Sequence, residues 1–377
     1  MSAPDPAAER PVPTGESTPA EAVPGSRLSA ESAAPTGTPA EAAPGARPSA
    51  ESAPPIVPTR VPWVEVGVFL VVTVGLGWLV CLPLWLSGKG LSDLTFVQLT
   101  GQALMFTPLL GTIAALIVQR RRAREPLASI PRRLGLWPLY PVGRVLGGTG
   151  LAVLATYLLV LATYLLAGAF GWMRLDLVGL SGFSAQQQAL PGLEELPLGA
   201  AVAVYLVIVV VNTGATALFA FGEEVGWRGW LLTSLRPLGT WPALLLIGLV
   251  WGLWHAPLIL LGYNFGRPDL TGLAFMVGGC IALSVLFGWL RLRTGSLWPA
   301  VFAHAALNAS SGMLLALVLS ADSPTPDMAL VTVLGVSGWL VSAVVVLVLV
   351  LVLTGQFRRQ PEVDVKPPRR NSAPAEE

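Results

Sequence analysis

Only two histidines occur among the 377 residues, and both lie in strongly apolar segments. His255 sits in Trp-Gly-Leu-Trp-His-Ala-Pro, and His304 sits in Phe-Ala-His-Ala-Ala-Leu-Asn. A carboxylate pair, Glu223 and Glu224, ends another apolar run. Ionisable side chains at membrane depth are costly and usually face a cavity or a partner. These residues therefore predict a buried polar site, and the function is to be sought there.

The carboxylate pair is followed by an arginine at helical spacing. Glu224 and Arg228 stand at i,i+4, so both lie on one face of a helix and the guanidinium can hold that carboxylate ionised. Glu223 is then the free carboxylate of the pair. Because its neighbour carries a like charge, Glu223 gains proton affinity. A carboxylate of this kind suits a general base that activates water.

The two histidines also belong to i,i+4 pairs, Trp251 with His255 and His304 with Asn308. A neutral imidazole can accept a proton, donate one or bind a metal. The Asn308 amide beside His304 supplies donors for a developing oxyanion. Glu223, His255 and His304 could instead hold one divalent metal such as zinc in an open three-ligand site. Metal-free and metal-assisted hydrolysis both stay open at this point, and no other cofactor is indicated.

The composition is that of a polytopic membrane protein. Hydrophobic residues make up 53% and charged residues 12% of the chain, and the mean hydropathy is +0.66. Soluble domains carry about a quarter charged residues. The net charge of +1 argues against a nucleic-acid partner. The bias toward Ala, Gly, Pro and Arg favours a bacterial plasma membrane.

We predict an all-α fold with about eight membrane-spanning helices, since about 20 apolar residues cross a bilayer. A count of seven is the alternative. The predicted spans are 62–86, 95–118, 145–169, 198–222, 241–261, 271–290, 297–319 and 329–354.

Arginine gathers in alternate loops, which places those loops in the cytoplasm. Both chain termini are then cytoplasmic, and Glu223 lies at the cytoplasmic end of the fourth span. His304 lies about 10 Å and His255 about 21 Å from the starts of their spans, at 1.5 Å per residue. His255 would therefore lie deeper than a shared site near the membrane surface requires. The arginines concerned are Arg120, Arg121, Arg122, Arg124, Arg132, Arg133, Arg144, Arg236, Arg291, Arg293, Arg358 and Arg359.

Low-complexity tails flank the predicted membrane domain of residues 59–356. Residues 1–58 are rich in Ala, Pro, Ser and Glu, and a stretch that begins at Thr18 returns from Thr38, a repeat of period 20. Such a composition buries too little apolar surface to offset the entropy of ordering. We therefore expect a disordered N-terminal tail, and a second disordered cytoplasmic tail over residues 357–377.

At these motifs the chain resembles the CPBP family, intramembrane proteases related to CaaX prenyl endopeptidases and to bacteriocin self-immunity proteins. The family pattern is Glu-Glu-x-x-x-Arg, then Phe-x-x-x-His, then His-x-x-x-Asn or Asp. The first motif stands at 223–228 and the third at 304–308. The second departs from the pattern, because Trp251 replaces the phenylalanine while His255 is retained. The resemblance covers about residues 198–310.

The resemblance implies a glutamate-dependent or metal-dependent endopeptidase whose cavity opens to the cytoplasm between helices. Glu223 and His255 would activate water, while His304 and Asn308 would hold the oxyanion. The supporting residues would be Glu224, Arg228 and Trp251.

The leading hypothesis is an endopeptidase that cleaves a membrane-associated peptide or protein near the cytoplasmic face. The alternative is a non-catalytic membrane partner or bacteriocin self-immunity protein, in which the Glu/His/Asn cluster only fixes helix packing. A proton-coupled transporter would also place Glu and His in the bilayer, although no sequence feature favours it.

Overall fold

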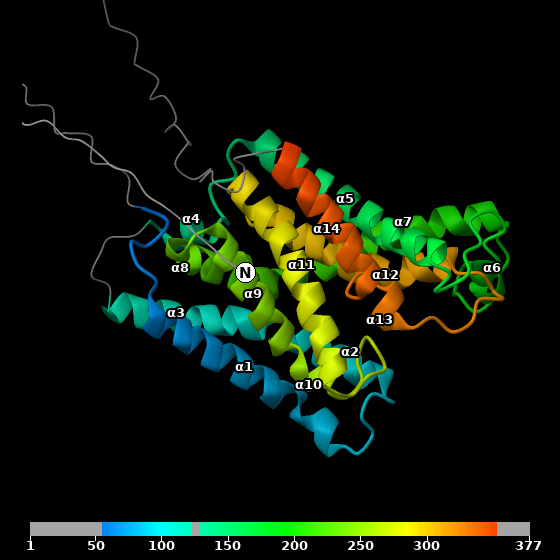
Figure 1. Cartoon of the computed structure of the whole chain (residues 1–377), viewed down its shortest axis with the longest axis horizontal. Coiled ribbons are helices and arrows are strands. Elements are labelled where there is room, and N and C mark those ends of the chain that lie inside the picture. The colour runs from blue at the N-terminus through cyan, green and yellow to red at the C-terminus, as the bar shows by residue number, and fades with distance from the viewer. Residues whose placement is uncertain (1–54, 123–127, 353–377) are drawn as a thin grey trace, which may run out of the picture. The chain divides into compact units, whose positions relative to one another are not determined.

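The computed structural model describes residues 55–122 and 128–352, which form helices joined by loops (Figure 1). The predicted all-α fold is confirmed, because no strand occurs in that part of the chain. The predicted tail of residues 1–58, apart from its last four residues, lies outside the described residues, as does the tail of residues 357–377.

The helices differ widely in length. The long ones are α1 (Trp63–Leu86), α3 (Thr107–Arg122), α5 (Val142–Ala169), α7 (Leu198–Glu224), α9 (Thr240–Trp254), α11 (Leu270–Thr294), α12 (Trp298–Val318) and α14 (Val336–Val352). The shorter ones are α2 (Leu94–Leu104), α4 (Ile130–Leu134), α6 (Ser181–Gln187), the π-helix η1 (Val225–Leu231), α8 (Leu232–Leu235), the 3-10 helix η2 (Arg236–Leu238), α10 (Ala256–Ile259) and α13 (Met328–Val331).

Seven helical segments of the described chain are long and apolar enough to cross a membrane. The chain is thus a multi-pass integral membrane protein. The fifth predicted span, 241–261, differs: α9 ends at Trp254, and the short α10 follows. Pro257 explains the break, because a prolyl ring inside a helix clashes with the carbonyl four residues earlier, here that of Leu253. Counted by length alone, the spans of the described chain number seven, which is the alternative count given above.

Helix α9 packs antiparallel to α11. A Cβ added to Gly248 would come within 2.5 Å of the Cα of Ile281, and one added to Gly252 within 2.5 Å of the Cα of Val277. Residue numbers therefore rise along α9 while those of the contacted residues on α11 fall, so the two helices run in opposite directions. Small residues permit such close backbone approach between membrane helices. Within the described residues, α9 is thus a shorter apolar helix packed among the seven that are long enough to span.

Helix α12 lies at the centre of the bundle. It packs against α5 and α7, and it also contacts α11 (Figure 1). Helix α12 carries His304, and α7 ends at Glu224. The packing of α12 against α7 therefore brings the third sequence motif next to the first.

One end of the bundle is held together around Arg133. The hydroxyl of Thr233 donates to the Arg133 carbonyl at 3.1 Å, and Arg291 Nη2 donates to the same carbonyl at 3.2 Å. The Arg133 guanidinium donates to Gln119 Oε1 at 3.1 Å. These contacts join the arginine-bearing ends of several helices, which we call the arginine end. They agree with the prediction that these ends share one membrane face.

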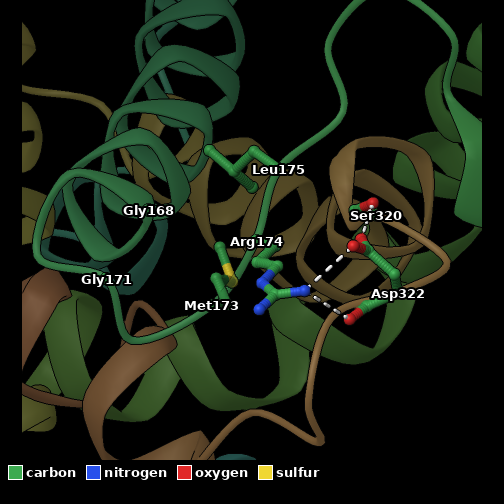
Figure 2. Close-up of a pocket in the computed structure, with 7 residues that line it drawn as sticks. All are labelled: Gly168, Gly171, Met173, Arg174, Leu175, Ser320 and Asp322. Carbon is green, nitrogen blue, oxygen red and sulfur yellow. Dashed lines mark hydrogen bonds and ion pairs between the residues drawn. The ribbon is translucent and has the colours of Figure 1, made fainter.

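The other end of the bundle, which we call the far end, has its own contacts. Arg174 after α5 pairs with Asp322 after α12, with 2.9 Å between Nη1 and Oδ2 (Figure 2). Trp85, near the end of α1, donates its indole N–H to the Pro257 carbonyl in α10 at 2.9 Å. The α9–α10 junction therefore lies toward the far end.

The fourth span extends well beyond its predicted end at residue 222. Helix α7 continues through η1, α8 and η2 to Leu238, and every residue from 222 to 235 is buried. Glu223 is therefore not at the membrane surface, because the 15 residues that separate it from Leu238 correspond to about 22 Å. That value is close to the depth of about 21 Å predicted for His255, whereas His304 remains at about 10 Å from the start of its span by the same rise.

Candidate active site

The carboxylate pair lies where an α-helix becomes a π-helix. Glu223 and Glu224 are the last residues of α7, and η1 begins at Val225. All residues of η1 are buried. A π-turn holds one residue more than an α-turn and often marks a functional site. The pair thus lies inside the protein, on a locally widened helix.

Glu224 binds two cationic or potentially cationic side chains through one oxygen. Its Oε1 accepts from Arg228 Nη1 at 2.8 Å, which confirms the predicted i,i+4 pair, and from His304 Nδ1 at 2.9 Å. The side chains of Arg228 and Glu224 are 1% and 0% exposed. The guanidinium carbon lies 4.4 Å from the ring centroid of Trp251 and 5.2 Å from that of Phe287. Aromatic faces thus add to the stabilisation of this buried cation.

Glu223 is held by two indole groups. Its Oε2 accepts from Trp251 Nε1 at 2.7 Å and from Trp227 Nε1 at 3.3 Å. Charge-assisted hydrogen bonds of this kind are short and orient the carboxylate. Glu223 is therefore not the free carboxylate that the sequence predicted. Both indoles bind the same oxygen, and this fixes how the carboxylate faces its surroundings.

The helix break at Pro257 determines which ring nitrogen of His255 carries the hydrogen. The His255 backbone N–H bonds the Gly252 carbonyl at 3.2 Å, whereas a regular helix would use the carbonyl of Trp251. The Trp251 carbonyl lies 2.8 Å from His255 Nδ1. A carbonyl can only accept, so Nδ1 carries the hydrogen and Nε2 of the neutral ring carries the lone pair.

One cavity of about 990 Å³ brings the four predicted catalytic side chains together. Its lining includes Glu223, His255, His304 and Asn308. They come from α7, from the α9–α10 junction and from α12. Glu223 and His304 are buried at 2% and 3% exposure, while Asn308 is exposed. Among these four side chains, Glu223 and His304 are thus buried, His255 is half-buried and the Asn308 amide is accessible.

Trp251 is the common neighbour of this group. Besides its bond to Glu223, its ring lies 5.3 Å from the His304 ring in an edge-on arrangement and 5.9 Å from the His255 ring. The residue at which the chain departs from the family pattern therefore contacts both histidines and binds the carboxylate.

Two of the predicted supporting residues lie behind the cavity wall. Glu224 and Arg228 are not among the lining residues, and they reach the site only through His304 and Trp251. Sequence reasoning missed Trp227 and Phe287. Trp227 stands at i+4 from Glu223, so the same spacing rule could have found it. Phe287, which stacks on His304 with 5.7 Å between ring centroids, carries no such signal.

A second cavity of about 610 Å³ lies at the far end (Figure 2). Its charged side chains, Arg174 and Asp322, pair with each other and are 65% and 70% exposed. None of the residues predicted for chemistry lines it. The larger cavity is therefore the candidate active site.

The described side chains present no ready-made metal site. Zinc needs at least three protein ligands around one point. Within residues 55–122 and 128–352, no three His, Cys, Asp or Glu side chains are grouped to hold a metal ion. Glu223, His255 and His304 all lie within these ranges. We therefore assign no step of the reaction to a metal.

Comparison with known proteins gives two findings. The family model described as "Type II CAAX prenyl endopeptidase Rce1-like" matches residues 199–310. The CAAX prenyl protease 2 of Methanococcus maripaludis is 30% identical over 104 residues, which is 26% of this chain and 38% of that protein. The chain thus spans well under half of this relative. The family-model match, residues 199–310, spans the positions of all three motifs and of the four predicted catalytic residues.

Proposed function

We propose that the chain is an intramembrane endopeptidase, from the premise that residues 199–310 match the Rce1-like family model. The reaction is hydrolysis of a peptide bond in a membrane-associated peptide or protein. The observation that carries the proposal is the shared cavity, in which Glu223, His255, His304 and Asn308 meet although they are widely separated in the sequence.

Water activation belongs to Glu223 and His255. The indole N–H groups bind Glu223 at Oε2, so Oε1 is assigned to the attacking water. His255 presents Nε2 with its lone pair, because Nδ1 donates to the Trp251 carbonyl. The water donates one hydrogen bond to each group. Glu223 takes the proton as the water oxygen bonds to the substrate carbonyl carbon, which is general base catalysis.

The developing oxyanion is assigned to His304 and Asn308. His304 donates from Nδ1 to Glu224, and a proton on Nε2 lets the imidazolium donate into the cavity. The Asn308 amide supplies a neutral donor. Such donors, held in place in a dry site, stabilise the charge of the tetrahedral intermediate. As the C–N bond breaks, the proton on Glu223 passes to the leaving nitrogen, which gives a carboxylic acid and an amine and leaves Glu223 ionised.

A direct test uses the full chain in proteoliposomes with a set of membrane-anchored peptides, whose products are identified by mass spectrometry. We expect cleavage at internal peptide bonds. Peptides that bind without being cleaved would support the non-catalytic partner instead, and would overturn the proposal.

Chelation is expected to leave this activity unchanged within about twofold, since no step is assigned to a metal. The measurement compares cleavage rates with and without EDTA or 1,10-phenanthroline. A rate that falls at least about tenfold (1.4 kcal/mol) and returns on adding zinc would contradict the expectation. Such a result would require the side chains of Glu223, His255 and His304 to move together around the ion.

Trp251→Phe is expected to lower the cleavage rate by about 10-fold to 100-fold. The change removes one N–H from the Glu223 carboxylate while keeping an aromatic ring, and a hydrogen bond to a charged group contributes about 1.5–3 kcal/mol. The control is Trp298→Phe, because the Trp298 N–H has no partner among the described residues. Equal rates for both variants would show that the indole N–H of Trp251 has no catalytic effect.

A further inference from the structure

The candidate active site occupies one extremity of its cavity. On α7 the lining residues are Asn212, Ala215, Thr216, Phe219 and Glu223. Glu223 is the last of these, and the helix then continues to the arginine end. The cavity therefore extends from Glu223 back along α7, away from the arginine end.

The other helices show the same polarity. On α12, which starts at the arginine end, the lining begins at His304 and runs to Leu315. On α11, which ends there, it runs from Met276 to Leu283 and stops. On α9 and α10 it falls within residues 251–258. On each of these helices the lining residues thus start at the level of the site and lie on its far-end side.

The segment between the site and the arginine end is packed protein. Residues 222–235 are all buried. Trp230 stacks on Phe69 with 5.2 Å between ring centroids, and Trp227 meets the same ring edge-on at 5.5 Å. This layer closes the cavity beneath Glu223 on the arginine side.

The opposite extremity of the cavity reaches elements of the far end. Gln98 on α2, and Tyr263 and Asn264 in the loop after α10, line it and are exposed. Helix α2 packs against α1 and faces the other lining helices across the cavity. The accessible side of the cavity is therefore the far end.

Arginine-rich loops remain in the cytoplasm, so the arginine end is the cytoplasmic end. Building on the proposed endopeptidase, we propose that its substrate enters from the extracytoplasmic face and is cut near the middle of the membrane. This reverses the cytoplasmic access that the family resemblance implied.

The lining also indicates the substrate class. It contains no Lys, Arg or Asp, and Glu223 is its one carboxylate. The amides of Gln98, Gln102, Asn212 and Asn264 offer donors and acceptors to a peptide backbone, while leucine and methionine provide most of the apolar lining. A charged segment would lack a counter-ion along this path. The substrate is therefore an uncharged, mainly apolar segment of a polypeptide anchored at the extracytoplasmic leaflet.

Cysteine labelling tests the direction of access. Gly101→Cys and Gly312→Cys place a thiol on the cavity wall, where an added Cβ meets no atom within 4 Å. Ser92→Cys marks the far end and Gly143→Cys the arginine end, and both positions are exposed. Each variant is treated with a membrane-impermeant maleimide in right-side-out spheroplasts and in inverted vesicles. Because Cys280 itself lines the cavity, every variant is built on a chain that carries Cys81→Ala and Cys280→Ala, and that chain gives the blank.

We expect both cavity thiols to label with Ser92→Cys in spheroplasts and to lose labelling in inverted vesicles, where Gly143→Cys labels. Cavity thiols that label only in inverted vesicles, together with Gly143→Cys, would overturn the inference. It would also be overturned if Ser92→Cys labelled only in inverted vesicles and Gly143→Cys only in spheroplasts. Because labelling requires no turnover, it tests access even in a chain that cleaves nothing. Failure of the proposed endopeptidase is seen separately, as absence of cleavage in proteoliposomes.

Discussion

Glu223→Gln is expected to lower peptide cleavage by about 10²-fold to 10⁴-fold, the range of general base catalysis. Glutamine keeps an oxygen that accepts from the Trp251 and Trp227 indoles, so the side chain stays in place. It cannot take a proton from water. The measurement is the cleavage rate of a membrane-anchored peptide in proteoliposomes, with the melting temperature determined on the same sample.

The matched control is Glu195→Gln, which makes the same chemical change at an exposed loop position. We expect it to retain the full rate. A Glu223→Gln protein that melts normally and keeps more than a tenth of the rate would refute the role assigned to Glu223. A protein that is inactive because it no longer folds would be recognised by its melting curve, and Glu223→Asp would then separate positioning from proton transfer.

Arg228→Met is expected to lower the free energy of unfolding by about 3–5 kcal/mol, the cost of removing one partner of a buried ion pair. The Glu224 carboxylate, 0% exposed, would keep only the His304 hydrogen bond. Methionine has a similar length and can still pack against Trp251 and Phe287. The free energy is measured by denaturant titration in detergent micelles.

The exposed pair at the far end provides the comparison. Arg174→Met breaks the contact with Asp322, whose side chains are 65% and 70% exposed. Surface ion pairs contribute about 0–1 kcal/mol, so a small change is expected. Equal losses in the two variants would show that the Glu224–Arg228 pair does not have the stabilising role assigned to it.

Local spacing allowed part of the site to be predicted from the sequence. The Glu224–Arg228 bond follows from i,i+4 geometry, which depends on four residues of helix and little else. The all-α fold follows from the length of the apolar runs, because about 20 apolar residues suit a helix, which satisfies its backbone groups within one segment in lipid. The three motifs likewise indicated the family, because each is a short run of residues whose pattern does not depend on how the helices pack.

Contacts between distant segments could not be predicted in this way. His304 reaches Glu224 across 80 residues, and Trp251 reaches Glu223 across 28. Which ring atom bonds which oxygen depends on how α12 and α9 pack against α7. The extension of α7 was also missed, because the carboxylate pair interrupts the hydropathy pattern as the end of a span does. The direction of the cavity follows from that extension.

The π-helical geometry of η1 has a consequence for how this chain can vary. Its turns close with i→i+5 hydrogen bonds, so loss of a single residue would tighten it to an α-helix. In a regular α-helix such a loss would turn everything beyond it by about 100°. Here the stretch would lose only the extra residue of its wide turn, so Thr233 would still face the Arg133 carbonyl. The carboxylates thus adjoin a stretch that can absorb the loss of one residue, which the regular helices around it cannot.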